Sequence, residues 1–236
     1  MQTSKQAAGV ALQAVEKGDR IMPTRGRTIM YVDNSNMFKS QKQVGWKLDV
    51  HKLFAKLGET GEIWQTHFFA AVTDPPRYQQ TNFYRIVKEE LHWETCILPL
   101  GRKTLHCYNC DKSWTTSAEK GVDVALATRL LNHAYNRAFD TAILLSGDKD
   151  YLETVKSVKN LGMRVEIVGF HRSMSGHLAA ESSVAVLYLD DIRTEIELVW
   201  PASEERELDE LMVDDELEVD AAAGVLHGRN EGSRVP

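Results

Sequence analysis

The sequence of 236 residues is poor in cysteine and has no long hydrophobic segment. Its three cysteines, an odd number, argue against a disulfide framework of the kind found in small secreted proteins. No apolar run approaches the roughly 18 residues that a membrane-spanning helix needs, and residues 1–20 lack the apolar core of a signal peptide. These absences exclude the disulfide-rich secreted and transmembrane classes, and they favour a cytoplasmic protein with no membrane partner.

Acidic residues are concentrated near the C-terminus. The formal net charge is −6 at pH 7, but residues 201–221 contain ten acidic residues and one arginine. This segment therefore carries −9, which leaves a mildly basic +3 on the rest of the chain. We expect a flexible leader over residues 1–26, one folded domain over 27–200 and an acidic disordered tail over 201–236.

Short apolar segments alternate with amphipathic ones along the expected domain. The apolar segments predict strands at residues 28–32, 62–72, 94–100, 141–145, 164–169 and 185–189. The amphipathic segments predict helices at residues 48–57, 78–91, 122–137, 151–161 and 173–182. Residues 101–120 interrupt this alternation. Because strands that alternate with helices form right-handed crossovers, the sequence predicts an α/β fold of three layers, α/β/α, with a mostly parallel central sheet.

Acidic residues follow two of the predicted strands and lie near the start of one helix. Asp33 comes directly after the first strand, whereas Asp148 and Asp150 follow the fourth strand and its Ser146-Gly147 turn. Asp123 lies one turn inside a helix, where its helical angle places it in the middle of the apolar face. Because open α/β sheets bring the carboxyl ends of neighbouring strands to one crevice, we expect the four carboxylates to converge there.

Each acidic residue also has a purely structural interpretation. Asp33 could simply cap or shape a turn, because the sequence Asp33-Asn-Ser-Asn36 is typical of turns, and Asp148 could cap a helix whose first turn contains Asp150. Asp123 could favour the start of its own helix through the helix dipole.

A site that contained all four carboxylates would require a cation, because like charges repel and burial raises carboxyl pKa values. Oxygen ligands without histidine favour Mg²⁺ or Mn²⁺. Two such ions about 4 Å apart can activate water and stabilise the leaving oxygen of a phosphodiester.

Three ordered motifs resemble the NYN domain, a branch of the PIN-like nucleases. They are Tyr31-Val-Asp33-Asn34-Ser-Asn36, Lys120-Gly-Val-Asp123 and Leu145-Ser146-Gly-Asp148-Lys-Asp150-Tyr151. The resemblance covers residues 27–190 and implies a PIN-like fold that cleaves RNA with the help of metal ions. It implies metal-binding roles for Asp33, Asp123, Asp148 and Asp150, and supporting catalytic roles for Asn34, Asn36 and Ser146. Tyr151 stands where the family often has phenylalanine, and we expect it in the core.

Cys107 and Cys110 have the spacing of half a zinc site. Zinc would need two more ligands, which a second copy of the chain would supply in a homodimer. The alternative is a pair of reduced thiols at the tip of a hairpin. A thioredoxin-like role is disfavoured because the motif does not open a helix after a strand. We expect Cys96, in the third strand, to be part of the core.

Basic and aromatic residues are candidates for a path that binds single-stranded RNA, since bases stack on aromatic rings without strong sequence preference. These residues are Arg77, Tyr78, Arg85, Arg102, Lys103, Lys112, Trp114, Arg164 and Arg172.

The sequence therefore predicts a metal-dependent endoribonuclease. The alternatives are a non-catalytic RNA-binding or regulatory module with the same fold and a phosphotransfer domain. Phosphotransfer through an acyl-phosphate usually needs Asp-x-Asp at the first strand, and this motif is absent. No Gly-x-Gly-x-x-Gly follows the first strand either, which argues against a dinucleotide-binding enzyme.

Overall fold

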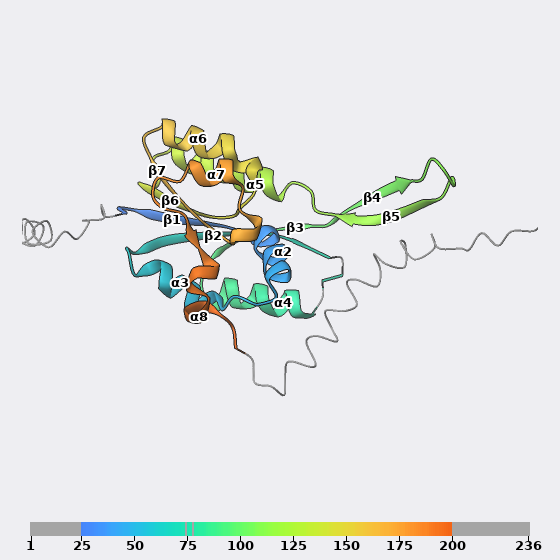
Figure 1. Cartoon of the computed structure of the whole chain (residues 1–236), viewed down its shortest axis with the longest axis horizontal. Helices are drawn as coiled ribbons and strands as arrows, with labels where there is room; N and C mark the ends of the chain where they lie inside the picture. The colour runs from blue at the N-terminus through green and yellow to red at the C-terminus, as the bar shows by residue number, and fades with distance from the viewer. Residues whose placement is uncertain (1–24, 74, 77, 200–236) are drawn as a thin grey trace, which may run out of the picture. The chain divides into compact units, whose positions relative to one another are not determined.

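The computed structural model describes residues 25–73, 75, 76 and 78–199 (Figure 1). The expected acidic tail lies outside these residues, as does the expected leader except for Arg25 and Gly26. None of the helices in the described part of the chain is long and apolar enough to cross a membrane.

The centre of the structure is a parallel sheet of six strands. The strands are β1 (Thr28–Asp33), β2 (Ile63–Val72), β3 (Glu94–Pro99), β6 (Thr141–Leu145), β7 (Arg164–Gly169) and β8 (Leu187–Tyr188). Their order is β3-β2-β1-β6-β7-β8, and every neighbouring pair is parallel. All six predicted strands are present, although β8 is shorter than the predicted segment. The order reverses at β1, because the chain first builds the sheet toward β3 and then crosses to β6 on the other side.

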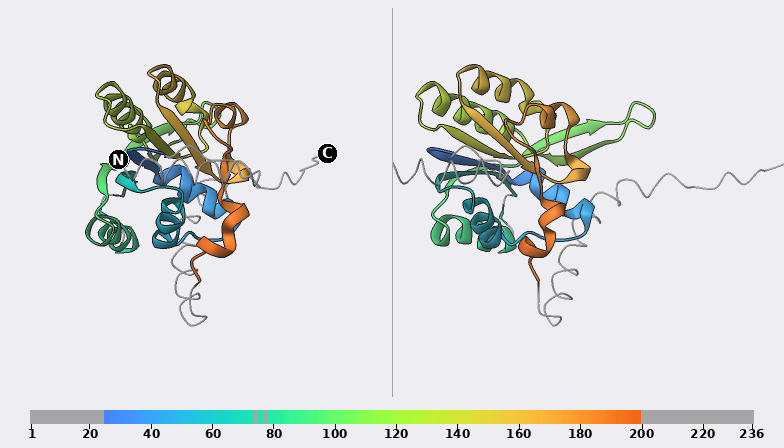
Figure 2. Two further views of the ribbon diagram at one scale, coloured as in Figure 1. Left: turned by 90° about the vertical axis from the view of Figure 1, so that its left-hand side faces the viewer. Right: turned by 60° about the vertical axis from the view of Figure 1, so that its left-hand side comes forward.

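Helices cover both faces of this sheet (Figures 1 and 2). The α-helices are α2 (Asn34–Val44), α3 (Val50–Gly58), α4 (Tyr78–Arg85), α5 (Val122–Tyr135), α6 (Leu152–Asn160), α7 (Gly176–Ala180) and α8 (Arg193–Ile196). Four short turns are the π-helical η1 (Ile86–Glu90) and the 3-10 helices η2 (Lys149–Tyr151), η3 (His171–Ser173) and η4 (Leu189–Ile192). Helices α5, α6 and α7 lie on one face, and α3, α4 and α8 lie on the other. The predicted three-layer α/β/α class is therefore confirmed.

The central strands are buried on both faces, as their largely apolar sequences predict. All residues of β1 and of β6 are buried. Successive side chains point to opposite faces, so that Ile29 packs with α5 and α6 while Met30 packs with the helices of the other face. This alternation divides the core into two clusters, one on each side of the sheet.

Helix α2 was not predicted from the sequence. It begins at Asn34, directly after β1, because the side chain of Asp33 caps it by accepting a hydrogen bond from the Asn36 amide (3.0 Å). The prediction that Asp33 caps or shapes a turn was thus correct for the capping role, but it missed helix α2, which follows Asp33. The helix is mostly polar and buries Met37 and Ser40, so its sequence has a weak apolar pattern.

Residues 101–118 form a separate two-stranded arm instead of a further crossover. Strands β4 (Gly101–His106) and β5 (Ser113–Ala118) pair antiparallel with each other and do not join the central sheet. The arm extends away from the layered part of the structure, with Cys107 and Cys110 in the turn at its tip (Figure 1).

At the opposite end of the sheet from the carboxyl ends of β1 and β6, a buried carboxylate lies between two arginines. The Arg25 Nη2 atom is 2.7 Å from one oxygen of Glu166, and the Arg164 Nη2 atom is 2.9 Å from the other. Glu166 is 5% exposed and Arg25 is 8% exposed. A buried ion pair of this kind is costly to break, since the remaining charge keeps its desolvation penalty.

We expect Glu166→Gln to lower the free energy of unfolding by about 3 kcal/mol in urea denaturation, because the buried Arg25 charge loses its partner. The matched control is Glu153→Gln. Its side chain is 81% exposed and pairs with Lys156 on α6, so its loss should cost less than about 1 kcal/mol. Equal losses of unfolding free energy for Glu166→Gln and Glu153→Gln would contradict the conclusion that the buried ion pair is costly to break.

Candidate active site

The candidate site lies where the strand order reverses. Asp33 is the last residue of β1, and Ser146 directly follows β6, the neighbouring strand with which β1 pairs in parallel register. In open α/β sheets, ligands bind in the crevice outside the carboxyl ends of the strands at such a switch point. The topology therefore brings two of the three sequence motifs to one place.

Asp33 is a buried carboxylate with hydrogen bonds to both oxygens. Its side chain and backbone together are 1% exposed. The Asn36 amide donates to Oδ1 (3.0 Å), while the hydroxyls of Ser146 (3.0 Å) and Tyr151 (3.2 Å) donate to Oδ2. Burial outweighs these donors and raises the pKa of Asp33 to about 6, with a further contribution from the negative charge of Asp123. Asp33 is thus a charge that the surrounding protein only partly stabilises.

Tyr151 connects Asp33 with Asp123. The Tyr151 hydroxyl lies 3.2 Å from Oδ2 of Asp33 and 3.1 Å from Oδ1 of Asp123. Burial and the two negative charges hold the pKa of the Tyr151 phenol far above its usual value, so it remains a hydrogen-bond donor. The residue is buried, as predicted for a core position, but its hydroxyl was not recognised as part of the site. A buried tyrosine needs a partner for its hydroxyl, and this requirement was the missed signal.

Asp123 is exposed, whereas its helical angle predicted a position in the middle of the apolar face. Of the predicted apolar face, Leu130 and Ala134 are buried, and Ala127 and Leu131 are half-buried. Asp123 lies in the first turn of α5, at the end of that face, and its carboxylate therefore reaches solvent while it accepts the hydrogen bond from Tyr151.

Asp148 and Asp150 take the positions that the capping interpretation predicts. Asp148 caps η2, because its Oδ1 accepts a hydrogen bond from the Asp150 amide (3.0 Å). The Asp148 amide in turn donates to the Ser146 hydroxyl (3.2 Å), which itself donates to Asp33, so two hydrogen bonds connect the Asp148 backbone with the Asp33 carboxylate. Asp150 is exposed and lies in the first turn. The capping bond to the Asp150 amide uses only Oδ1 of Asp148, so the second carboxylate oxygen is not used in this bond.

The turn between β6 and η2 is held in place by α2 and by the segment around η3. The Gly147 amide donates to the Asn36 side-chain oxygen (3.0 Å), and the Gly147 carbonyl accepts from the Ser175 amide (2.9 Å). A Cβ atom at position 147 would lie 2.5 Å from the Ser173 carbonyl oxygen, so only glycine fits this close approach. Asn36 is therefore a positioning residue for the turn, while Asn34 begins α2 and is half-buried.

Glu119 is a further carboxylate near this end of the sheet that sequence reasoning missed. It accepts a hydrogen bond from the Ser35 hydroxyl, and its other oxygen is 3.3 Å from the Lys39 ammonium. Ser35 and Lys39 both lie in α2, the helix that begins directly after Asp33. The signal in the sequence was its position next to the Lys120-Gly-Val-Asp123 motif.

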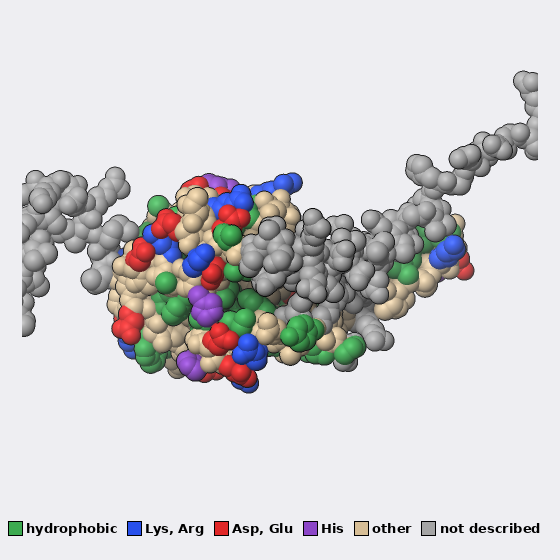
Figure 3. Space-filling view, turned by 90° about the horizontal axis from the view of Figure 1, so that it is seen from below, with side chains coloured by type: hydrophobic (Ala, Val, Ile, Leu, Met, Phe, Trp, Pro, Cys, Tyr) green, Lys and Arg blue, Asp and Glu red, His purple; other side chains and the backbone are tan. Residues whose placement is uncertain are grey.

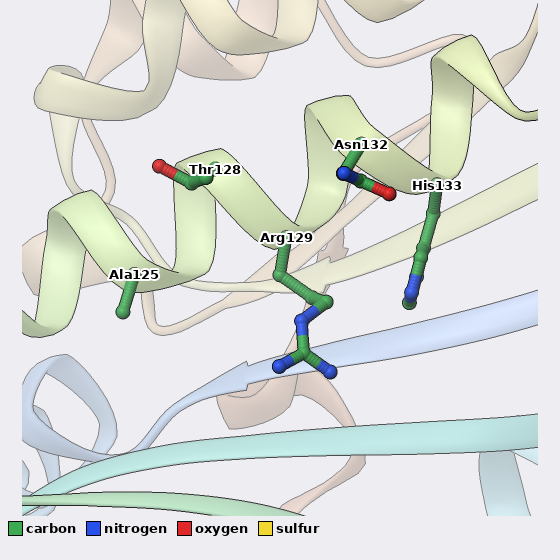
Figure 4. A pocket seen from close by; sticks show the side chains of 5 residues that line it. All are labelled: Ala125, Thr128, Arg129, Asn132 and His133. Atoms are coloured by element: carbon green, nitrogen blue, oxygen red, sulfur yellow. The ribbon is translucent and has the colours of Figure 1, made fainter.

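A hollow of about 490 Å³ lies along α5 on the side that faces β1 and β2 (Figure 4). It is lined by Ala125, Thr128, Arg129, Asn132 and His133. The Arg129 and His133 side chains point from the helix toward the strands.

Two histidines and a tyrosine form the polar contacts beneath this hollow. The Tyr31 hydroxyl is 2.8 Å from Nδ1 of His133, and the rings of His133 and His67 lie 4.8 Å apart. Burial, reinforced by the neighbouring His133 and Arg129 charges, lowers the pKa of His67 to about 4, which makes it neutral at pH 7. None of these histidines belongs to the carboxylate motifs.

The predicted basic path is only partly described. The side chains of Arg77, Arg102 and Lys103 lie outside the described residues. Arg164 pairs with the buried Glu166, and Arg85 pairs with Glu90, so both have structural partners. On the lower face, charged side chains of both signs are mixed in the part of the chain that is described (Figure 3).

The donor chemistry of the site fits a hard divalent cation. Asp33, Asp123 and Asp148 offer carboxylate oxygens, and no histidine or cysteine accompanies them in their motifs. Burial is the main cause of the raised pKa of Asp33, and a nearby cation would offset this desolvation of the carboxylate. Within residues 25–73, 75, 76 and 78–199, however, no three His, Cys, Asp or Glu side chains are close enough together to hold an ion as they stand. The expected convergence of four carboxylates is therefore seen only for the Asp33–Tyr151–Asp123 link and the neighbouring Asp148.

Tyr151→Phe tests the link between the carboxylates, because it removes the hydroxyl and keeps the ring. The hydroxyl lowers the pKa of Asp33, so its loss should raise that pKa further above the unfolded value. The resulting penalty applies where the carboxylate is charged, above pH 6, and fades as pH falls toward 4. In metal-free buffer, we expect a loss of about 2 kcal/mol in unfolding free energy at pH 8 and about 1 kcal/mol at pH 4.5.

The control for this measurement is Tyr135→Phe, because Tyr135 is the last residue of α5 and is 70% exposed. Its unfolding free energy should match that of the unmodified chain at both pH values. An equal loss for Tyr151→Phe at pH 8 and pH 4.5 would show that its hydroxyl does not stabilise a charge.

Comparisons with known proteins place this arrangement in a family. A family model of the NYN domain matches residues 27–189. An uncharacterized protein of Sinorhizobium fredii (strain NBRC 101917 / NGR234) is 42% identical over 53 residues, which is 22% of this chain and 25% of that protein. The matched segment thus spans about a quarter of the length of this curated relative.

Among solved structures, a protein of unknown function from Vibrio parahaemolyticus RIMD 2210633 has a similar fold. The TM-score is 0.57 at 17% sequence identity, and the likeness covers 75% of this chain and 99% of that chain. At this identity the likeness supports the fold alone. The family model, in contrast, matches more than half of the sequence and contains all three acidic motifs, so the chain belongs to the NYN domain family, with its PIN-like, nuclease-type fold.

Proposed function

We propose that the chain is a metal-dependent endoribonuclease that hydrolyses RNA phosphodiester bonds at the carboxyl end of β1. The observation that supports this most strongly is the buried Asp33 carboxylate at the switch point of the sheet, which shares the Tyr151 hydroxyl with Asp123. A negative charge that is buried without full compensation is expensive for stability, and such groups concentrate at functional sites.

Asp33, Asp123 and Asp148 would hold the divalent ions, Mg²⁺ or Mn²⁺, with Asp150 as a fourth carboxylate at the solvent-exposed side. When bound, two such ions would activate water, neutralise the phosphate charge and stabilise the leaving oxygen. Their charge would also offset the desolvation of Asp33, which links metal binding to the stability of the fold.

The residues of the chain itself orient the carboxylates. The Ser146 hydroxyl and the Asn36 amide hold Asp33 from two sides, which fixes the direction of both of its oxygens. Tyr151 donates from the core, so that the carboxylates of Asp33 and Asp123 face a common hydroxyl. Asn36 also holds the Gly147 amide and thereby positions the turn that carries Asp148. These contacts pre-organise the site before substrate binds.

RNA would extend from the carboxylates along α5. Arg129 follows Asp123 by six residues on this helix, which corresponds to about 9 Å along its axis. Together with Thr128, Asn132 and His133, it lines a polar hollow that suits phosphate and ribose groups. A contact to the backbone of single-stranded RNA at this place would give affinity without base specificity.

Asp33→Asn and Asp123→Asn should each reduce cleavage of single-stranded RNA at saturating Mn²⁺ by at least about 100-fold, since each removes an anionic ligand while preserving shape. Cleavage of a labelled oligonucleotide, with and without metal, is the measurement. Asp140→Asn is the matched control, because Asp140 binds the Arg27 backbone at the other end of β6 and is exposed. Wild-type rates in Asp33→Asn would reject the assignment of this residue.

Metal binding should also be visible without substrate. In metal-free buffer at pH 7.5, Asp33→Asn should raise the free energy of unfolding by up to about 3 kcal/mol, because it removes a charge whose folded-state pKa is raised to about 6. Added Mn²⁺ should stabilise the unmodified chain and leave the thermal midpoint of Asp33→Asn unchanged. A similar Mn²⁺ shift in both proteins would place the ion elsewhere.

The alternative is a non-catalytic RNA-binding or regulatory module. It is favoured by the absence, among the described residues, of three acidic, histidine or cysteine side chains grouped closely enough to hold an ion. Calorimetric titration with single-stranded RNA separates the two functions. Binding that is equally strong in EDTA and in Mn²⁺, with intact RNA recovered afterwards, would support the alternative.

A further inference from the structure

The β4–β5 arm is an isolated hairpin, and an isolated two-stranded hairpin is marginally stable in water. Its strands pair only with each other in the sheet topology. Figure 1 shows that the arm extends beyond the layered part of the structure, and Figure 3 shows apolar and charged side chains exposed together on it. Because the central sheet does not stabilise the arm, an interaction at the tip of the arm would.

The turn at the tip is closed by hydrogen bonds of the Cys107 backbone. The Cys107 amide donates to the Lys112 carbonyl (2.8 Å), and the Asp111 amide donates to the Cys107 carbonyl (2.9 Å), with Asp111 at a φ of 55°. Hydrogen bonding from the Cys110 side chain and from the backbone amides of Asn109 and Cys110 holds the pKa of the Cys107 thiol below its usual value. Amide donors aimed at a sulfur stabilise its thiolate form, which is the form that binds metals.

Two cysteines make up half of a tetrahedral zinc site, and the same arm does not supply the other half. His106 is adjacent, but its Nδ1 is 2.9 Å from the Ser113 hydroxyl and its Nε2 is 3.1 Å from Asp111, so both ring nitrogens already have partners. The remaining cysteine, Cys96, lies in β3 and packs against the core. In the described part of the chain, no group of three possible ligands includes the tip.

We propose that the arm is a zinc-dependent dimerisation element, in which Cys107 and Cys110 from two copies of the chain bind one Zn²⁺ through four thiolates. A symmetric dimer offers the same two cysteines twice, which completes the four-coordinate site that structural zinc requires. This inference does not depend on the nuclease proposal, because it involves neither the carboxylates nor α5.

The surroundings of the tip suit a second copy. Tyr108 is 94% exposed and Trp114 is 42% exposed, and both lie in or next to the turn. Large aromatic side chains of this kind are enriched in protein interfaces, where they bury area at low entropic cost. A zinc ion bound by four thiolates carries a net charge of −2, and the exposed Lys112 of each copy lies beside the turn where it can offset this charge.

The test uses the full chain, purified under reducing conditions and titrated with zinc alone. We expect about half a zinc ion per chain and conversion from monomer to dimer in light scattering, reversed by EDTA. Cobalt in place of zinc should show the intense charge-transfer absorption of thiolate ligands. Cys107→Ser and Cys110→Ser should each abolish dimerisation, whereas Cys96→Ser should not affect it.

Four outcomes would overturn the proposal. They are a failure of the tip to bind zinc, one zinc per chain on a monomer, a dimer that persists in EDTA, and a dimer that forms equally in Cys107→Ser. Because Asp33→Asn leaves the arm intact, that variant should bind zinc and dimerise like the unmodified chain. Its zinc binding thus separates a failure of this proposal from a failure of the proposed nuclease function.

Discussion

The burial of one carboxylate at the end of β1 is the constraint around which the carboxyl end of the sheet is built. Asp33 is 1% exposed, so its charge depends on donors that the fold must supply. Those donors come from three segments, the start of α2, the residue after β6 and η2, and the first of these is far from the other two in the sequence. Each segment is therefore fixed relative to the others by a hydrogen bond to the same side chain. The cost of the buried charge also gives a physical reason for a cation at this position.

Much of the fold follows from local sequence patterns. Runs such as Thr141–Leu145 are almost entirely apolar, and their short length favours a strand buried on both faces. Their alternation with helices then restricts the topology to parallel crossovers. The position of Asp33 after the first strand and of Ser146 after the fourth could be predicted for the same reason. The pairing of β1 with β6 brings these two positions together in one site. This agrees with the prediction of a crevice where the strand order reverses.

The features that could not be predicted depend on contacts between distant residues. Helix α2 has a weak apolar pattern, because it buries only Met37 and Ser40 in full. The role of the Tyr151 hydroxyl cannot be seen in the sequence. The hydrophobic pattern predicts only that the ring is buried, and it does not indicate which side chains accept a hydrogen bond from the hydroxyl. The exposure of Asp123 depends on where α5 begins relative to the sheet, and helix boundaries are the least certain part of a periodicity argument. Family membership, in contrast, needed only the order of three motifs.

The arm enters and leaves the domain at one point, because Gly101 at its beginning pairs with Ala118 at its end. The ends of the insertion are thus neighbours in space, and a short connection from Leu100 to Glu119 could close the crossover between β3 and α5 without it. Shortening, lengthening or replacing the arm would leave the strand order of the central sheet unchanged. The proposed self-association and the proposed carboxylate chemistry depend on separate parts of the chain, so a change in the arm would alter the first and leave the second unchanged.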